Sequence, residues 1–135
     1  MKSLLLFIAI LCAVTLSSSS TPSVTNAANP DKKERATMKF NQPVKLMGLT
    51  LKAGEYLFVH DDEAMARGEA CTSVYKGNAE VPDKLVVAFH CTPVPRAKVA
   101  SFTVRTLLTS PEQYEVREFQ FAGSTESHLV PLPVG

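Results

Sequence analysis

The hydrophobic pattern after residue 35 consists of short apolar runs with a period of two, separated by turn-forming residues. Residues 36–40 alternate in this way, and so do residues 101–107, where Phe102 and Val104 share one face. This period is typical of half-buried β-strands. Further strands are expected at residues 56–60, 71–76, 114–121 and 128–130, with residues 44–46 as a short continuation of 36–40 and one helical turn at 64–67.

The longest apolar run outside the N-terminus is Leu85–Cys91, with the sequence Leu-Val-Val-Ala-Phe-His-Cys, and two prolines follow it closely. Its length and its β-branched and aromatic content predict a strand buried on both faces at the centre of a sheet. Alternation places Cys91 on the same face as Phe89, and His90 on the opposite face.

The strand expected at residues 114–121 changes its parity midway. Tyr114 and Val116 share one face, whereas Phe119 and Phe121 share the other. A β-bulge near residues 117–118 would bring all four apolar side chains to the same face.

The pattern as a whole predicts an all-β protein, an antiparallel β-sandwich or partly open barrel of about seven short strands. A chain of 135 residues is long enough for one such domain. We expect residues 1–27 to form a signal peptide, helical in its apolar part, residues 28–35 a flexible lead-in, and residues 36–133 a single β-domain.

The N-terminus has the three parts of a secretory signal peptide. Lys2 supplies positive charge, Leu4–Leu16 is apolar and uncharged, and Ser17–Ala28 is polar with small side chains. Cleavage is expected after Ala27, within a window from Thr21 to Ala28, with a competing site at residues 18–20. The mature protein would then be secreted or periplasmic, with no membrane span.

A cysteine near a signal peptide raises the alternative of a lipid anchor. Cys12 follows Leu11, which is not the small residue that lipoprotein processing requires, and it lies inside the apolar segment. We therefore expect Cys12 to be removed with the signal peptide. An uncleaved N-terminal anchor is the alternative.

One turn-and-strand pattern resembles a known group of proteins. It runs Phe40-x-x-Pro43-Val44 and then Gly48-x-x-Leu51-x-Ala53-Gly54-x-Tyr56, about a quarter of the chain. It resembles the opening of a group of small secreted, largely uncharacterised bacterial all-β proteins with a Leu-x-Ala-Gly-x-Tyr motif. The resemblance implies a secreted all-β domain, and it implies no activity or catalytic residue.

The charge of the chain is close to balanced, with 14 Lys and Arg against 13 Asp and Glu. The expected signal peptide carries only Lys2 of these, so the mature protein would be nearly neutral. The one basic cluster, Lys32–Arg35, contains Glu34 and lies next to the processing site. Nucleic acids and anionic membranes require a concentrated positive field, so neither is expected as a partner.

Cys71 and Cys91 are the two cysteines expected to remain after export. In an oxidising compartment, two cysteines about twenty residues apart usually form a disulfide, and we expect one here. Closing a loop of this length stabilises a fold by about 3 kcal/mol. The alternative is a redox-active or metal-binding thiol pair, although the chain has no Cys-x-x-Cys motif.

The three histidines, His60, His90 and His128, lie far apart in the sequence and have no metal-ligand spacing. We expect no metal site, no cofactor and no catalytic residues, since the chain also has no Gly-x-Ser-x-Gly motif. The leading hypothesis is a non-catalytic binding or envelope-associated module whose partner is a protein or envelope component. The alternative is a metal-binding protein or metal-dependent enzyme using His60, His90 and His128, if their strands are neighbours.

Overall fold

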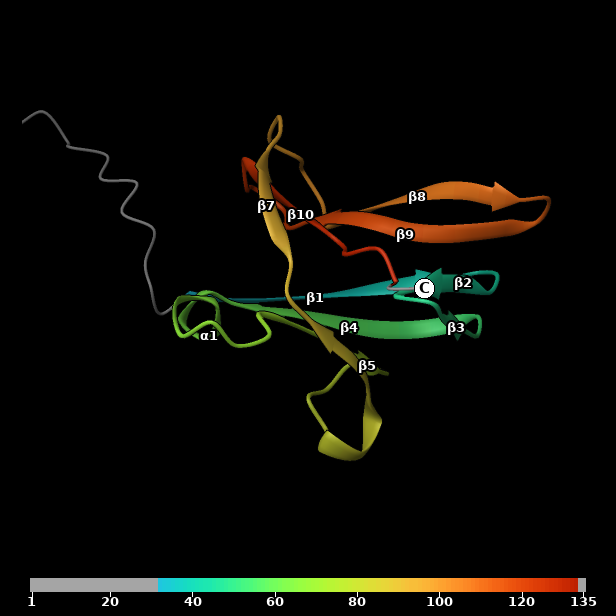
Figure 1. The fold of residues 1–135 in the computed structure, drawn as a ribbon, viewed down its shortest axis with the longest axis horizontal. Helices are drawn as coiled ribbons and strands as arrows, with labels where there is room; N and C mark the ends of the chain where they lie inside the picture. Colours follow the sequence, from blue (N-terminus) through green and yellow to red (C-terminus); the bar gives the residue numbers. More distant parts are fainter. Residues whose placement is uncertain (1–31, 134–135) are drawn as a thin grey trace, which may run out of the picture.

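The computed structural model describes residues 32–133, which form two β-sheets packed face to face (Figure 1). The prediction of an all-β protein is confirmed, and the described residues form no closed barrel. The expected signal peptide and Cys12 lie outside the described residues. The strands are β1 (Lys33–Phe40), β2 (Val44–Leu46), β3 (Leu49–Leu51), β4 (Gly54–Asp61), β5 (Thr72–Lys76), β6 (Leu85–Phe89), β7 (Thr92–Pro95), β8 (Thr103–Ser110), β9 (Gln113–Gln120) and β10 (Glu126–Leu129).

The first sheet has four antiparallel strands in the order β1-β4-β5-β6. β1 begins at Lys33, three residues before the expected start, because residues 33–35 continue its pairing with β4. A short helix, α1 (Asp62–Ala66), follows β4 where one helical turn was expected, and a 3₁₀ turn, η1 (Pro82–Lys84), precedes β6.

The second sheet has the order β3-β2-β9-β10-β7, with β8 paired to β9. Its pairs are antiparallel except for β2 and β9, which run parallel, a departure from the expected antiparallel arrangement. β2 and β3 are joined by Met47 and Gly48, both at positive φ (53° and 78°), as a two-residue hairpin requires. β10, expected at an edge, lies between β9 and β7.

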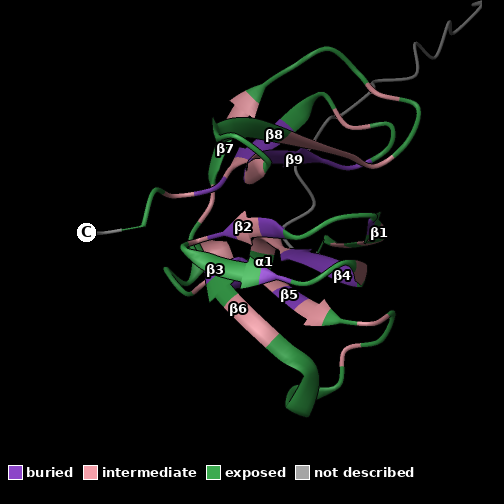
Figure 2. Cartoon of the chain, turned by 90° about the vertical axis from the view of Figure 1, so that its right-hand side faces the viewer, coloured by how far each residue is buried: buried purple, intermediate pink, exposed green. Residues whose placement is uncertain are grey.

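The prediction that Leu85–Cys91 forms one central strand is wrong. β6 ends at Phe89 and lies at the edge of the first sheet, and Figure 2 shows that much of this strand is exposed or half-buried. Leu85 is 46% exposed, and His90 is also exposed. The chain then crosses to the second sheet, where β7 is an edge strand that tolerates its two prolines. An apolar run that spans two sheets has the same composition as a buried central strand, and this caused the error.

The predicted β-bulge in β9 is confirmed. Arg105 pairs with Glu118 and Thr106 with Val116, so Arg117 is the extra residue. The bulge restores parity, and Val116, Phe119, Phe121 and, partly buried, Tyr114 all reach the core.

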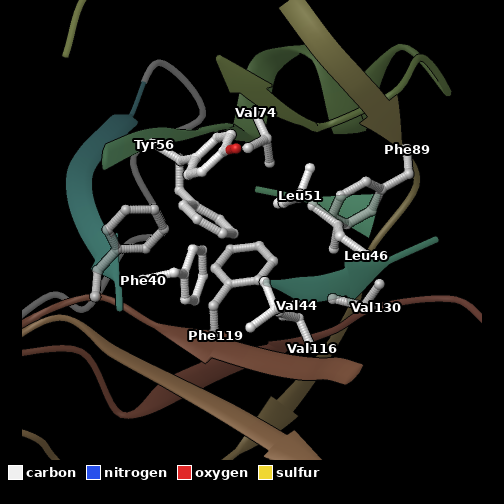
Figure 3. Packing of buried hydrophobic residues seen from close by; sticks show 12 residues of the cluster. Phe40, Val44, Leu46, Leu51, Tyr56, Val74, Phe89, Val116, Phe119 and Val130 are labelled. Carbon is white, nitrogen blue, oxygen red and sulfur yellow. The ribbon is translucent and has the colours of Figure 1, made fainter. Parts of the chain in front are cut away.

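Aromatic side chains fill the space between the sheets (Figure 3). Phe119 is fully buried and lies at their centre, with its ring centroid 5.5 Å from that of Phe58, 5.9 Å from Phe121 and 6.3 Å from Phe89. Val44, Leu46 and Leu51 from the β2–β3 hairpin close the cluster.

The outer face of the second sheet carries a charged network around Glu118, which is only 5% exposed. Arg96 donates two hydrogen bonds to its carboxylate at 3.1 and 2.7 Å, and Arg105 donates one at 2.7 Å. Ser127 of β10 donates to the same carboxylate at 2.8 Å. The network therefore connects β8, β9 and β10, and it helps to hold β10 in register.

We predict that Glu118→Gln destabilises the protein by about 2 kcal/mol at neutral pH, because charged hydrogen bonds to a buried carboxylate are lost. Burial alone would raise the pKa of Glu118, but Arg96, Ser127 and Arg105 lower it below its usual range. Stabilisation from a lowered pKa is present above the unfolded-state pKa, about 4.3, and is lost as the pH falls through the folded-state value. The difference in the free energy of unfolding between wild type and Glu118→Gln should therefore become smaller below about pH 4.

Urea unfolding from pH 7 to pH 3, with chelator present, measures this difference. The control is Glu69→Gln, since the ion pair of Glu69 with Arg67 is exposed and contributes little. Equal pH profiles for wild type and Glu118→Gln would contradict the prediction.

No helix within residues 32–133 is long and apolar enough to cross a membrane.

Candidate metal centre

Two cysteines and two histidines meet between the sheets near α1. His60 is near the end of β4, Cys71 directly precedes β5, Cys91 lies between β6 and β7, and His128 is in β10. His60, His128 and Cys71 are at most 2% exposed, and Cys91 is half-buried. We call these four residues the Cys₂His₂ cluster.

Strand pairing explains why residues so distant in sequence meet. In the first sheet Thr72 pairs with both His60 and Phe89, which places Cys71 and Cys91 beside the histidine. In the second sheet Thr92, the residue after Cys91, pairs with Leu129, the residue after His128. Cys91 lies where the chain crosses from β6 to β7, and it is therefore next to His60 of the first sheet and His128 of the second.

The potential ligand atoms lie close together. Cys91 Sγ is 3.6 Å from His60 Nδ1 and 3.6 Å from His128 Nδ1. Cys71 Sγ is 2.7 Å from Cys91 Sγ, and the ligand atoms of His60, Cys71 and Cys91 all lie within 4.8 Å of one another. His128 is not part of this set of three and adjoins it through Cys91. The two imidazole rings lie next to each other, with centroids 4.0 Å apart.

A carboxylate orients one imidazole. His60 Nε2 is 2.7 Å from Asp62 Oδ1, so its N–H donates a hydrogen bond to this oxygen and leaves the Nδ1 lone pair directed toward the cluster. The turn that carries Asp62 is held by Asp61, whose side chain accepts hydrogen bonds from the backbone N–H groups of Glu63 and Ala64 and caps α1. Metal-bound histidines typically have such a carboxylate partner.

The pKa values of the cluster favour a thiolate at Cys71 and a neutral imidazole at His128. A hydrogen bond with Cys91 lowers the pKa of Cys71 to about 3, against its burial, while the adjacent Cys71 sulfur raises the pKa of Cys91. Burial lowers the pKa of His128 to about 4, helped by the nearby His60. For His60, burial lowers the pKa, but interactions with Cys71 and Asp62 outweigh it and the net pKa is raised.

The backbone also supports a charged sulfur. The N–H group of Cys91 donates a hydrogen bond to Cys71 Sγ at 3.1 Å, and Thr72 Oγ1 is 3.8 Å from the same sulfur. Such donors stabilise a thiolate, which is the form of cysteine that binds metal.

The distances fit a tetrahedral zinc site in part. With Zn–S near 2.3 Å and Zn–N near 2.05 Å, the S···N edge of a tetrahedron is about 3.5 Å. The two observed distances of 3.6 Å match this edge. The S···S edge would be about 3.8 Å, so the two sulfurs must separate by about 1 Å to bind a tetrahedral ion.

The expected Cys71–Cys91 disulfide is not present in the structure. The sulfurs are neighbours, as the spacing predicted, but their 2.7 Å separation exceeds the covalent S–S length of about 2.05 Å. Both cysteines are free in the structure.

Of the three histidines considered from the sequence, the structure brings together His60 and His128 but not His90. His90 is exposed, although its neighbours Phe89 and Cys91 turn inward. Its position agrees with its parity, opposite to Cys91. Two separate alternatives from the sequence, a metal-binding thiol pair and a metal site using His60, His90 and His128, together contained all four residues, but neither combined cysteines with histidines.

Comparison of the chain with protein-family models, with curated proteins and with solved structures found no match. The class of protein is therefore defined here by its fold and its cluster, an all-β domain with a buried Cys₂His₂ set.

Proposed function

We propose that this protein is an exported, non-catalytic β-domain that binds one Zn²⁺ ion through Cys71, Cys91, His60 and His128. The observation that carries the proposal is the position of Cys91 Sγ, 3.6 Å from both imidazole Nδ1 atoms, with Cys71 Sγ beside it. Two thiolates and two imidazoles form a donor set typical of zinc.

The charge of the cluster supports a divalent ion. Two thiolates and two neutral imidazoles together carry two negative charges, which a buried site tolerates only when they are compensated. Zn²⁺ provides this compensation without redox chemistry. The bound ion would also connect the two sheets, because His60 belongs to the first sheet and His128 belongs to the second.

The number of protein ligands supports a non-catalytic role. Four protein ligands leave no coordination position for a water molecule or substrate, whereas catalytic zinc sites usually keep one open. Export follows from the N-terminal signal-peptide pattern, and the ion would be taken up or held in that compartment.

The proposal is tested by titrating the reduced, metal-free protein with Zn²⁺ against a chromogenic chelator. We expect one ion per chain, and native mass spectrometry should show the same stoichiometry. Saturating zinc at about a thousand times its Kd should raise the free energy of unfolding by about 4 kcal/mol. If the protein fails to compete with the chelator for Zn²⁺, the proposal is wrong. If the protein binds Cu⁺ in preference to Zn²⁺, the ion of the site is copper and not zinc.

A further inference from the structure

The inference concerns control of the cluster, and it rests on the proposed zinc site. We propose that the Cys71–Cys91 pair makes zinc binding redox-dependent, because a small disulfide compound converts the two thiols into a protein disulfide that cannot hold the ion.

The positions of the two sulfurs make both the disulfide state and the zinc-bound state accessible. Their separation of 2.7 Å lies between the disulfide length of about 2.05 Å and the zinc-bound edge of about 3.8 Å. Each state is reached by moving the sulfurs by about 1 Å or less. No side chain needs to leave the space between them.

The two states exclude each other chemically. A disulfide removes both thiolates from the donor set and leaves His60 and His128 as the remaining ligands of the cluster. Conversely, a zinc-bound thiolate has its lone pair engaged by the metal, which suppresses its attack on another sulfur. Zinc therefore protects the thiols, and oxidation releases zinc.

The difference in exposure sets the order of events. Cys91 is half-buried, while Cys71 is 2% exposed. Cys71, the favoured thiolate, accepts the proton of Cys91 across the 2.7 Å between the two sulfurs. The Cys91 thiolate formed in this way attacks one sulfur of the reagent RS–SR, and RS⁻ leaves and takes up this proton. Cys71 Sγ then attacks Cys91 Sγ, the mixed disulfide bond breaks, and the second RS⁻ leaves. The thiolate and thiol of the reduced pair lose two electrons and one proton, and with one further proton from solvent the reagent is reduced to two thiols.

The experiment uses oxidised glutathione with the reduced protein, in metal-free and zinc-loaded forms. Thiol titration and intact mass follow the protein disulfide, and a chromogenic chelator follows released zinc. We expect the metal-free protein to form the disulfide at least ten times faster than the zinc-loaded protein. The oxidised protein should bind zinc at least a hundredfold more weakly, and a dithiol reductant should restore binding.

Single-cysteine variants test the order of attack. Cys71→Ser, which keeps Cys91, should accumulate the mixed disulfide with glutathione, whereas Cys91→Ser should react at least ten times more slowly. Similar rates for the two variants would overturn the assigned order.

The outcomes separate this inference from the zinc site itself. If the reduced protein binds zinc and the oxidised protein binds it equally well, the redox inference is wrong and the zinc site stands. If zinc binds and both forms oxidise at the same rate, the protective role of zinc is wrong. If the reduced protein binds no zinc, the proposed function fails, and the redox inference fails with it.

Discussion

Replacing His128 with phenylalanine is expected to lower zinc affinity by on the order of 100-fold or more, because one of four ligands is lost from a closed site. His128 is 1% exposed, and its ring stacks on Phe119 with centroids 5.1 Å apart. Phenylalanine preserves an aromatic ring at this position while removing Nδ1. The variant therefore separates loss of a ligand from loss of packing.

The matched control is the same substitution at the neighbouring candidate, His90→Phe. His90 is exposed and is not part of the cluster, so its replacement should leave the zinc affinity unchanged. Competition titration of both variants and of wild type measures the affinities, and circular dichroism of the metal-free forms checks folding. Equal affinities for wild type and a folded His128→Phe variant would remove His128 from the site.

Replacing Phe119 with alanine is expected to lower the free energy of unfolding by about 3–5 kcal/mol, the usual effect of removing a large buried aromatic side chain. Phe119 is fully buried and contacts aromatic rings from both sheets, including Phe58 of the first sheet. The cavity cannot collapse easily, since β9 is paired on both sides. For a domain of this size, that loss is a large share of the total stability.

Urea unfolding of the metal-free protein measures this effect without a contribution from zinc. Leu107→Ala is the control, because Leu107 lies on the adjacent strand β8 but is 53% exposed, and surface substitutions usually change stability by about 0.5 kcal/mol or less. A loss below about 1 kcal/mol for Phe119→Ala would contradict the central position assigned to this ring.

Much of the core could be predicted from the sequence because alternation along a strand determines which face each side chain takes. The parity change between Val116 and Phe119 was sufficient to place a bulge, and the structure has it at Arg117. The same reasoning separated Cys91 from His90, and the structure has His90 exposed and Cys91 turned inward.

The position of each strand within its sheet could not be predicted in the same way. The two-residue period along a strand shows which face of the sheet each side chain takes. It does not show which other strands are paired with that strand. Leu85–Cys91 has the composition of a central strand, yet it consists of an edge strand and a crossing to the other sheet. The number of strands was also underestimated, because short strands such as β2 and β7 are defined by their partners rather than by their own pattern.

The sequence alone determined the all-β class, the inward side chains and the proximity of the two cysteines, because these follow from local periodicity and short loop closure. Only the tertiary structure decided that His60 and His128 join them, and that the sulfurs remain unbridged. Those contacts span up to 37 residues and depend on the registers of two separate sheets. No pattern along one strand contains that information, since register is set by how the sheets pack around a shared core.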